Sequence, residues 1–121
     1  GASAAGRGGV VGSPNGVTEH ILGVPRPLLE TDGAGSEPCA RLLAENVRTM
    51  CDAAVGISFT GVAGPEPLEG HPPGTVYVGI AMRGRDTVVH RLTLSGTRDA
   101  IRTRTAKYGC FFLLEMLAAG R

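Results

Sequence analysis

Apolar positions along the chain form three runs that are typical of β-strands. The run 53–60 is apolar on both faces, as expected of an inner strand that is covered on both sides. The runs 75–82 and 87–94 alternate apolar residues with others, and the polar turn 83–86 separates them, so together they predict a hairpin. Val10 and Val11, which lie among glycines, indicate the end of one further strand.

Two longer stretches have the periodicity of amphipathic helices. Ser36 is a suitable N-cap for the first helix, and Thr97 is a suitable N-cap for the second, which extends to about Ala119. Apolar residues follow at helical spacing, namely Cys39, Leu43, Val47 and Met50 in the first helix and Ile101, Thr105, Tyr108, Phe112 and Met116 in the second. Gly109, inside the second stripe, marks a place of close packing. Helices on a sheet predict a layered α/β domain.

Length and composition limit what this domain can be. A chain of 121 residues is one domain, with a flexible start of small residues at 1–9 and a folded part at 10–121. Hydrophobic residues make up 42% and aromatic residues only 4%, so the core must consist of Ala, Val, Leu and Ile. A net charge of +1 does not indicate nucleic-acid binding. No apolar run approaches the roughly 20 residues that a membrane span needs.

The cysteines exclude two common kinds of site. Cys39, Cys51 and Cys110 are odd in number and far apart, so they lack the spacing of a zinc site or of a redox pair. We therefore expect no metal and no cofactor, and small buried thiols in a reducing compartment such as the cytoplasm or an organelle matrix.

A glycine-rich loop joins the first two of these strands. It begins with Thr60-Gly61-Val62-Ala63-Gly64-Pro65 and ends with Pro72-Pro73-Gly74-Thr75-Val76. Glycines without a Cβ let backbone N–H groups approach a neighbouring ligand, and anions suit such a geometry.

This loop and four further motifs resemble one family. The motifs are Gly8-Gly9-Val10-Val11, Ile21-Leu22-Gly23-Val24-Pro25, Gly33-Ala34-Gly35-Ser36-Glu37 and Ser95-Gly96-Thr97-Arg98-Asp99-Ala100-Ile101-Arg102. In this order they resemble the CinA C-terminal domain family, the nicotinamide-nucleotide (NMN) amidohydrolases. The resemblance covers nearly the whole chain and implies a layered α/β/α domain with a mixed central sheet. It also implies that the chain starts after the family's first helix, which is expected to be missing.

The resemblance implies a chemistry whose residues this chain largely lacks. The family hydrolyses the carboxamide of NMN with a Ser in a Ser-Cys-Thr-Gly-Gly turn, a Lys base and a nearby Tyr. No Ser-x-Thr-Gly-Gly occurs in the 121 residues. Ser13 falls on the Tyr position and Thr18 on the Lys position, while Asn15 is retained. Because a threonine hydroxyl cannot act as a general base near neutral pH, the chain is expected to be catalytically inactive.

Ligand-binding positions of the family are better represented. The matching residues are Thr60, Gly61, Gly64 and Gly74 in the loop, and Arg98 and Arg102 near the start of the last helix. A guanidinium there could bind a phosphate. Glu66 and Pro67 replace two glycines of the family loop, which adds a negative charge and removes a backbone donor.

Three functions are therefore open at the level of sequence. The first is an inactive CinA-type domain that serves as a structural or accessory subunit of a larger assembly. The second is an active NMN deamidase whose catalytic serine segment precedes Gly1. The third is a regulatory domain that binds a nucleotide without turnover. Expected partners are other protein chains or further copies of this chain, with a nicotinamide nucleotide as the ligand.

Overall fold

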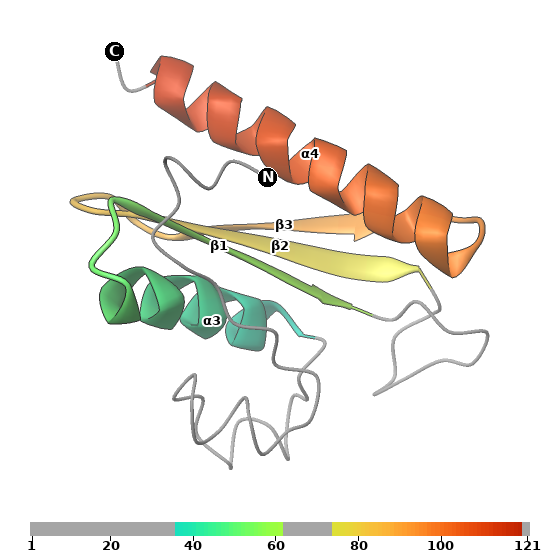
Figure 1. Ribbon diagram of the computed structural model, residues 1–121, viewed down its shortest axis with the longest axis horizontal. Helices are drawn as coiled ribbons and strands as arrows, with labels where there is room; N and C mark the ends of the chain where they lie inside the picture. Colours follow the sequence, from blue (N-terminus) through green and yellow to red (C-terminus); the bar gives the residue numbers. More distant parts are fainter. Residues whose placement is uncertain (1–35, 62–73, 120–121) are drawn as a thin grey trace.

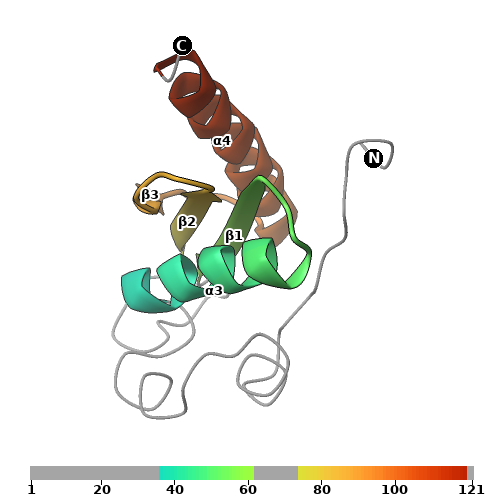
Figure 2. The same ribbon diagram turned by 90° about the vertical axis from the view of Figure 1, so that its left-hand side faces the viewer.

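Two helices and three strands form the part of the chain that the structure describes. The computed structural model describes residues 36–61 and 74–119. The elements are α3 (Glu37–Met50), β1 (Val55–Gly61), β2 (Thr75–Met82), β3 (Val88–Thr93) and α4 (Arg98–Ala119). α3 covers one face of the sheet and α4 the other, so the described part is a three-layer α/β/α arrangement (Figures 1 and 2).

The strands pair in the order β1-β2-β3, and both pairs are antiparallel. The expected hairpin is confirmed, because the amide of Arg85 donates to the carbonyl of Met82 at 3.1 Å where β2 turns into β3. The sheet was expected to be mixed, and the described strands contain antiparallel pairs alone. The predicted strand end at Val10 and Val11 lies outside the described residues, as do the flexible start at 1–9 and the glycine at position 64.

β2 is the centre of the core. All eight of its residues are buried, because strands lie on both sides of it and helices lie above and below. Successive side chains point to opposite faces, so Val76, Val78, Ile80 and Met82 all face α4. These four residues pack with Ile101 of α4 into one apolar cluster.

β1 is less covered than the sequence predicted. Val55 and Ile57 are only partly buried, and Phe59 is 51% exposed. The physical reason is that β1 has one neighbour, β2, among the described strands, whereas an inner strand would have two. The expected near-complete burial therefore applies to β2 and is wrong for β1.

α3 lies very close to the sheet because small residues line the contact. Ala40 and Ala44 are fully buried against the strands. A Cβ added at Gly79 would come within 2.5 Å of the Ala40 carbonyl oxygen, and one at Gly56 would clash with the Ala44 carbonyl. Ser58 secures the contact, since its hydroxyl donates to the Ala40 carbonyl at 2.6 Å.

The predicted buried face of α3 is only partly correct. Cys39 is buried, but Leu43 and Val47 are intermediate and Met50 is 50% exposed. Arg41 and Glu45 of α3 both bind Thr87, the residue before β3. The Arg41 guanidinium donates to the Thr87 carbonyl at 2.6 Å, and the Thr87 hydroxyl donates to the Glu45 carboxylate at 2.5 Å.

α4 begins and packs largely as predicted. The amide of Ala100 donates to the hydroxyl of Thr97 at 3.1 Å, which confirms the N-cap. Gly109 is a place of close packing, because a Cβ there would lie 2.6 Å from a ring carbon of Phe59. The His90 ring of β3 stacks on the Phe112 ring at 3.8 Å. Tyr108 is 42% exposed, so its predicted place on the buried stripe is wrong.

Candidate ligand-binding site

All five described elements begin or end at one end of the sheet. β1 ends at Gly61, which pairs with Val76 at the start of β2. Because Ala40 contacts Gly79 and Ala44 contacts Gly56, α3 runs antiparallel to β1 and its first residue lies toward the end of that strand. α4 starts at the same end (Figure 1). Both helices therefore direct their N-termini to the end of the sheet where the glycine-rich loop leaves.

Two threonine hydroxyls are buried at this end of the sheet. Thr60 pairs with Tyr77, so Thr75 is its diagonal neighbour on the face that α3 covers. Neither side-chain oxygen has a hydrogen-bond partner within the described ranges, and Thr75 is 0% exposed. Buried polar atoms in native proteins are almost always satisfied by protein, water or a ligand. These two hydroxyls are consequently the strongest indication of a binding position.

Gly61 and Gly74, the two glycines of the predicted site that the structure describes, allow close contacts between backbone segments. A Cβ at Gly61 would lie 2.5 Å from the Thr75 carbonyl oxygen. Gly74 has a φ of +85°, and a Cβ there would collide with the Leu94 carbonyl. The Leu94 amide also donates to the Gly74 carbonyl at 2.9 Å, which holds the ends of β2 and β3 together. These glycines bring the strand ends close to one another at the site.

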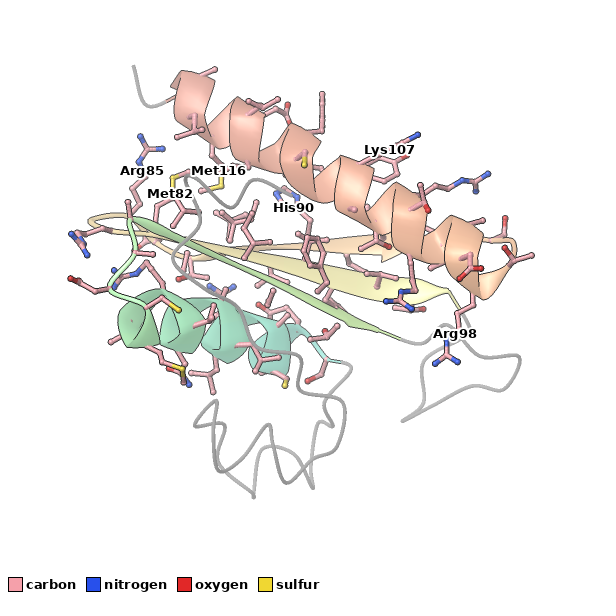
Figure 3. All side chains as sticks on the ribbon, viewed as in Figure 1. Met82, Arg85, His90, Arg98, Lys107 and Met116 are labelled. Atoms are coloured by element: carbon pink, nitrogen blue, oxygen red, sulfur yellow. The ribbon has the colours of Figure 1, made fainter. Side chains whose placement is uncertain are left out.

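The two arginines of the predicted site lie on α4. Arg98 begins the helix and Arg102 follows one turn later, and both are exposed. Arg98 extends from the helix toward the end of the sheet, whereas Lys107 points away from the sheet (Figure 3). Within the described ranges no carboxylate forms a salt bridge with either arginine. Both guanidinium groups are thus available to an anion.

The helix ends carry both capping groups and acidic side chains. The Ser36 hydroxyl accepts from the Cys39 amide at 3.4 Å at the start of α3. Glu37 lies in the first turn of α3 and forms a salt bridge of 2.6 Å with Arg41, while Asp99 lies in the first turn of α4. Helix N-termini attract negative charge, so these carboxylates stabilise the helices and compete with an added anion.

Of the catalytic positions that the family resemblance names, the structure describes none. Ser13, Asn15 and Thr18 lie outside the described residues. His90 lies on β3 and is stacked on Phe112 of α4. Across 36–61 and 74–119, no cluster of three His, Cys, Asp or Glu residues could hold a metal ion. Over the same ranges, no helix has the length and apolar character that crossing a membrane requires.

Sequence reasoning named Thr60 and the two arginines as candidate site residues but did not name Thr75. The available signal was its place directly after Gly74 at the start of a run that is otherwise apolar. A hydroxyl at this position is buried if its strand lies in the centre of the sheet, but the sequence does not show which strand is central.

The comparison with known protein families settles the classification. The model of the CinA C-terminal domain matches residues 1–117. The chain belongs to the CinA C-terminal domain family. The α/β fold expected from the sequence motifs is confirmed with it.

Curated relatives are similar over almost the whole chain. A putative competence-damage inducible protein of Geobacillus kaustophilus (strain HTA426) is 80% identical over 119 residues, which are 98% of this chain and 29% of that protein. The corresponding protein of Bacillus cereus (strain AH187) is 53% identical over 117 residues, or 97% of this chain and 28% of that protein. The chain thus spans less than a third of the length of these relatives.

Solved structures of the family have the same fold. The crystal structure of the competence damage-inducible protein A of Klebsiella pneumoniae subsp. pneumoniae has a TM-score of 0.82 and 27% identity, and the match covers 87% of this chain and 65% of that one. A CinA superfamily protein of Enterobacter cloacae has a TM-score of 0.80 and 30% identity, with 86% and 62% covered.

Proposed function

We propose that this CinA-type domain binds a nicotinamide nucleotide at the end of its sheet, does not hydrolyse it, and serves as an accessory subunit of a larger assembly. The observation that carries the binding proposal is the pair of buried hydroxyls, Thr60 and Thr75, at the end where both helices begin. NMN, the substrate of the family's amidohydrolases, is the ligand that this family membership favours.

Each group at this end has a role in such binding. A nucleotide phosphate is an anion, and the guanidinium groups of Arg98 and Arg102 can form charge-assisted hydrogen bonds with it. The N-termini of α3 and α4 add favourable electrostatic potential. The hydroxyls of Thr60 and Thr75 can donate to ligand oxygens directly or through an ordered water.

The absence of turnover is supported by the sequence. Amide hydrolysis needs an activated nucleophile and a base. Thr18 stands where the family has its Lys, and Ser13 stands where it has its Tyr. A threonine hydroxyl cannot accept the proton, so bound NMN is expected to keep its carboxamide.

A titration of NMN by calorimetry tests the binding. Arg98→Ala and Arg102→Ala are each expected to weaken the binding about 10-fold, because a charge-assisted hydrogen bond contributes about 1.5–3 kcal/mol when buried and less when exposed. Arg83→Ala is the matched control. Arg83 lies at the opposite end of the sheet and forms an exposed salt bridge with Asp52. Equal affinities for all three variants and the parent chain would overturn the proposal.

An ammonia-release assay tests the proposal that the chain does not hydrolyse NMN. The chain with NMN is expected to release no ammonia above the buffer background. Release within a few-fold of that of an intact homologue under the same conditions would show that the chain is an enzyme.

A second function is favoured by one comparison. The curated relatives are more than three times as long as the matched segment, so residues outside the 121 could supply a nucleophile and a base. In that case the described site is the substrate site of an active NMN deamidase. This second function predicts ammonia release from a longer chain that retains Ser13 and Thr18, whereas an inactive domain predicts none.

A further inference from the structure

Arg91 of β3 lies on the same face of the sheet as the two buried threonine hydroxyls. The next residue of the strand, Leu92, packs against the apolar cluster that β2 forms with α4. Since successive side chains of a strand alternate between the two faces, Arg91 lies on the face that α3 covers. Thr60 and Thr75 lie on this face as well, so all three belong to one surface of the sheet.

The strand register places Arg91 close to Thr75. Arg91 pairs with Tyr77 of β2, and Thr75 precedes Tyr77 by two residues on the same strand. Residues in such diagonal positions have Cβ atoms roughly 7–8 Å apart, which is within reach of a long side chain. Thr60 pairs with the same tyrosine from the other side. One face at one end of the sheet therefore carries two buried hydroxyls and a guanidinium.

The guanidinium of Arg91 has no partner in the described part of the chain. Arg91 is exposed, and within residues 36–61 and 74–119 it forms neither a hydrogen bond nor a salt bridge, as is also true of Arg98 and Arg102. The other described arginines each donate to a carbonyl or carboxylate oxygen, namely Arg41, Arg48, Arg83, Arg85 and Arg104. The arginines without such a bond lie in the second half of β3 and in the first two turns of α4, near the end of the sheet where both helices begin.

We propose that Arg91 binds the phosphate of the nucleotide and makes the site selective for the mononucleotide over the nucleoside. This inference rests on the proposed function, because it requires the nucleotide to bind at this end of the sheet. A guanidinium donates two parallel hydrogen bonds to phosphate oxygens, and the remaining oxygen can accept from a threonine hydroxyl. Arg98 extends toward the end of the sheet from α4 (Figure 3), so a phosphate there meets cations from both faces.

The charges around this position favour an anion. α3 directs its N-terminus to the same end of the sheet, which adds favourable potential on the face where Arg91 lies. Glu37, the acidic residue in the first turn of α3, already forms a salt bridge of 2.6 Å with Arg41. Its negative charge is therefore balanced within the helix, and Arg91 stays available to a phosphate.

The site is expected to need Arg91 only when the ligand carries a phosphate. Nicotinamide riboside differs from NMN in lacking the phosphate alone, so it offers no anion to the guanidinium. A residue that merely supports the fold would affect the binding of both ligands to the same extent. The ratio of the two affinities therefore separates phosphate binding from a structural role.

Calorimetric titration of the chain with NMN and with nicotinamide riboside tests the inference. Arg91→Gln is expected to weaken NMN binding about 5-fold to 10-fold, because it removes a charge-assisted hydrogen bond at an exposed position. The affinity of this variant for nicotinamide riboside is expected to stay within about 2-fold of that of the parent chain. Arg91→Lys keeps the charge but loses the planar group that contacts two oxygens, so an intermediate loss of NMN affinity is expected.

Arg83→Gln is the matched control for the change in net charge. Arg83 is also exposed, but it lies at the opposite end of the sheet and forms a salt bridge with Asp52. Its substitution removes one positive charge and leaves the site intact, so the affinities for both ligands are expected to stay at the parent values.

Three results would overturn the inference. One is NMN binding that Arg98→Ala weakens and Arg91→Gln does not, which would leave the proposed function intact. Another is an equal loss of affinity for NMN and for nicotinamide riboside, which would make the role of Arg91 structural. The third is a parent chain that does not bind NMN, which would overturn the proposed function as well.

Discussion

The hydroxyl of Thr75 links the stability of the domain to its proposed binding role. It is completely buried and has no hydrogen-bond partner within the described ranges. An unsatisfied buried hydroxyl costs about 1–3 kcal/mol. Thr75→Val keeps the shape and removes the hydroxyl, so it is expected to raise the free energy of unfolding by about 1 kcal/mol while it weakens NMN binding. Urea unfolding and NMN titration of the same variant measure the two effects.

Ser58→Ala is the matched control on the same face of the sheet. The Ser58 hydroxyl donates to the Ala40 carbonyl at 2.6 Å, so its removal loses a buried hydrogen bond. We expect a decrease in stability of about 1 kcal/mol and no change in NMN affinity. If Thr75→Val lowered stability as Ser58→Ala does, the hydroxyl of Thr75 would have a structural partner and no role in a ligand site.

At the scale of elements, alanine substitution at two similarly crowded glycines is predicted to change the stability of the domain by different amounts. An alanine at Gly79 would place its Cβ 2.5 Å from the backbone carbonyl oxygen of Ala40, which cannot move without shifting α3. An alanine at Gly109 would meet a ring carbon of Phe59 at 2.6 Å, but this ring is 51% exposed and can rotate away. Gly79→Ala should therefore cost about 1–3 kcal/mol or more.

Gly109→Ala is expected to be nearly neutral in the same chemical unfolding experiment. Alanine is about 1 kcal/mol more favourable than glycine inside a helix, and this gain offsets the displacement of the Phe59 ring. If Gly109→Ala lowered the free energy of unfolding as much as Gly79→Ala does, the Phe59 ring would have to be held as rigidly as the backbone.

The elements that local sequence determines were predicted well. The strand at 75–82 and the turn after it follow from alternation and from the polar tetrapeptide, and both helix caps follow from the hydroxyls of Ser36 and Thr97. Helical spacing also placed Gly109 at a close contact. Such features depend on a few neighbouring residues, so a single sequence contains them.

The face of α3 could not be predicted in the same way. Leu43, Val47 and Met50 have the right spacing for a core stripe, yet Ala40 and Ala44 make the closest contact. The reason is that the strands below carry glycines, which favour a small-residue face of the helix. This choice depends on residues far apart in the sequence. The burial of Thr75 depends in the same way on β2 being central, so the sequence alone did not mark Thr75 as a candidate.

At the scale of the whole molecule, the order of the elements explains where the candidate site lies. α3 runs antiparallel to β1, and α4 follows β3, which ends beside the start of β2. Both helices therefore begin at the same end of the sheet (Figure 1), and Arg98 is the first residue of α4. The opposite end has the 83–86 turn and the salt bridge of Arg83 with Asp52. The N-termini of both helices and Arg98 favour anion binding at the end of the sheet where the helices begin. This arrangement follows from the order of the elements and is not contained in any single sequence motif.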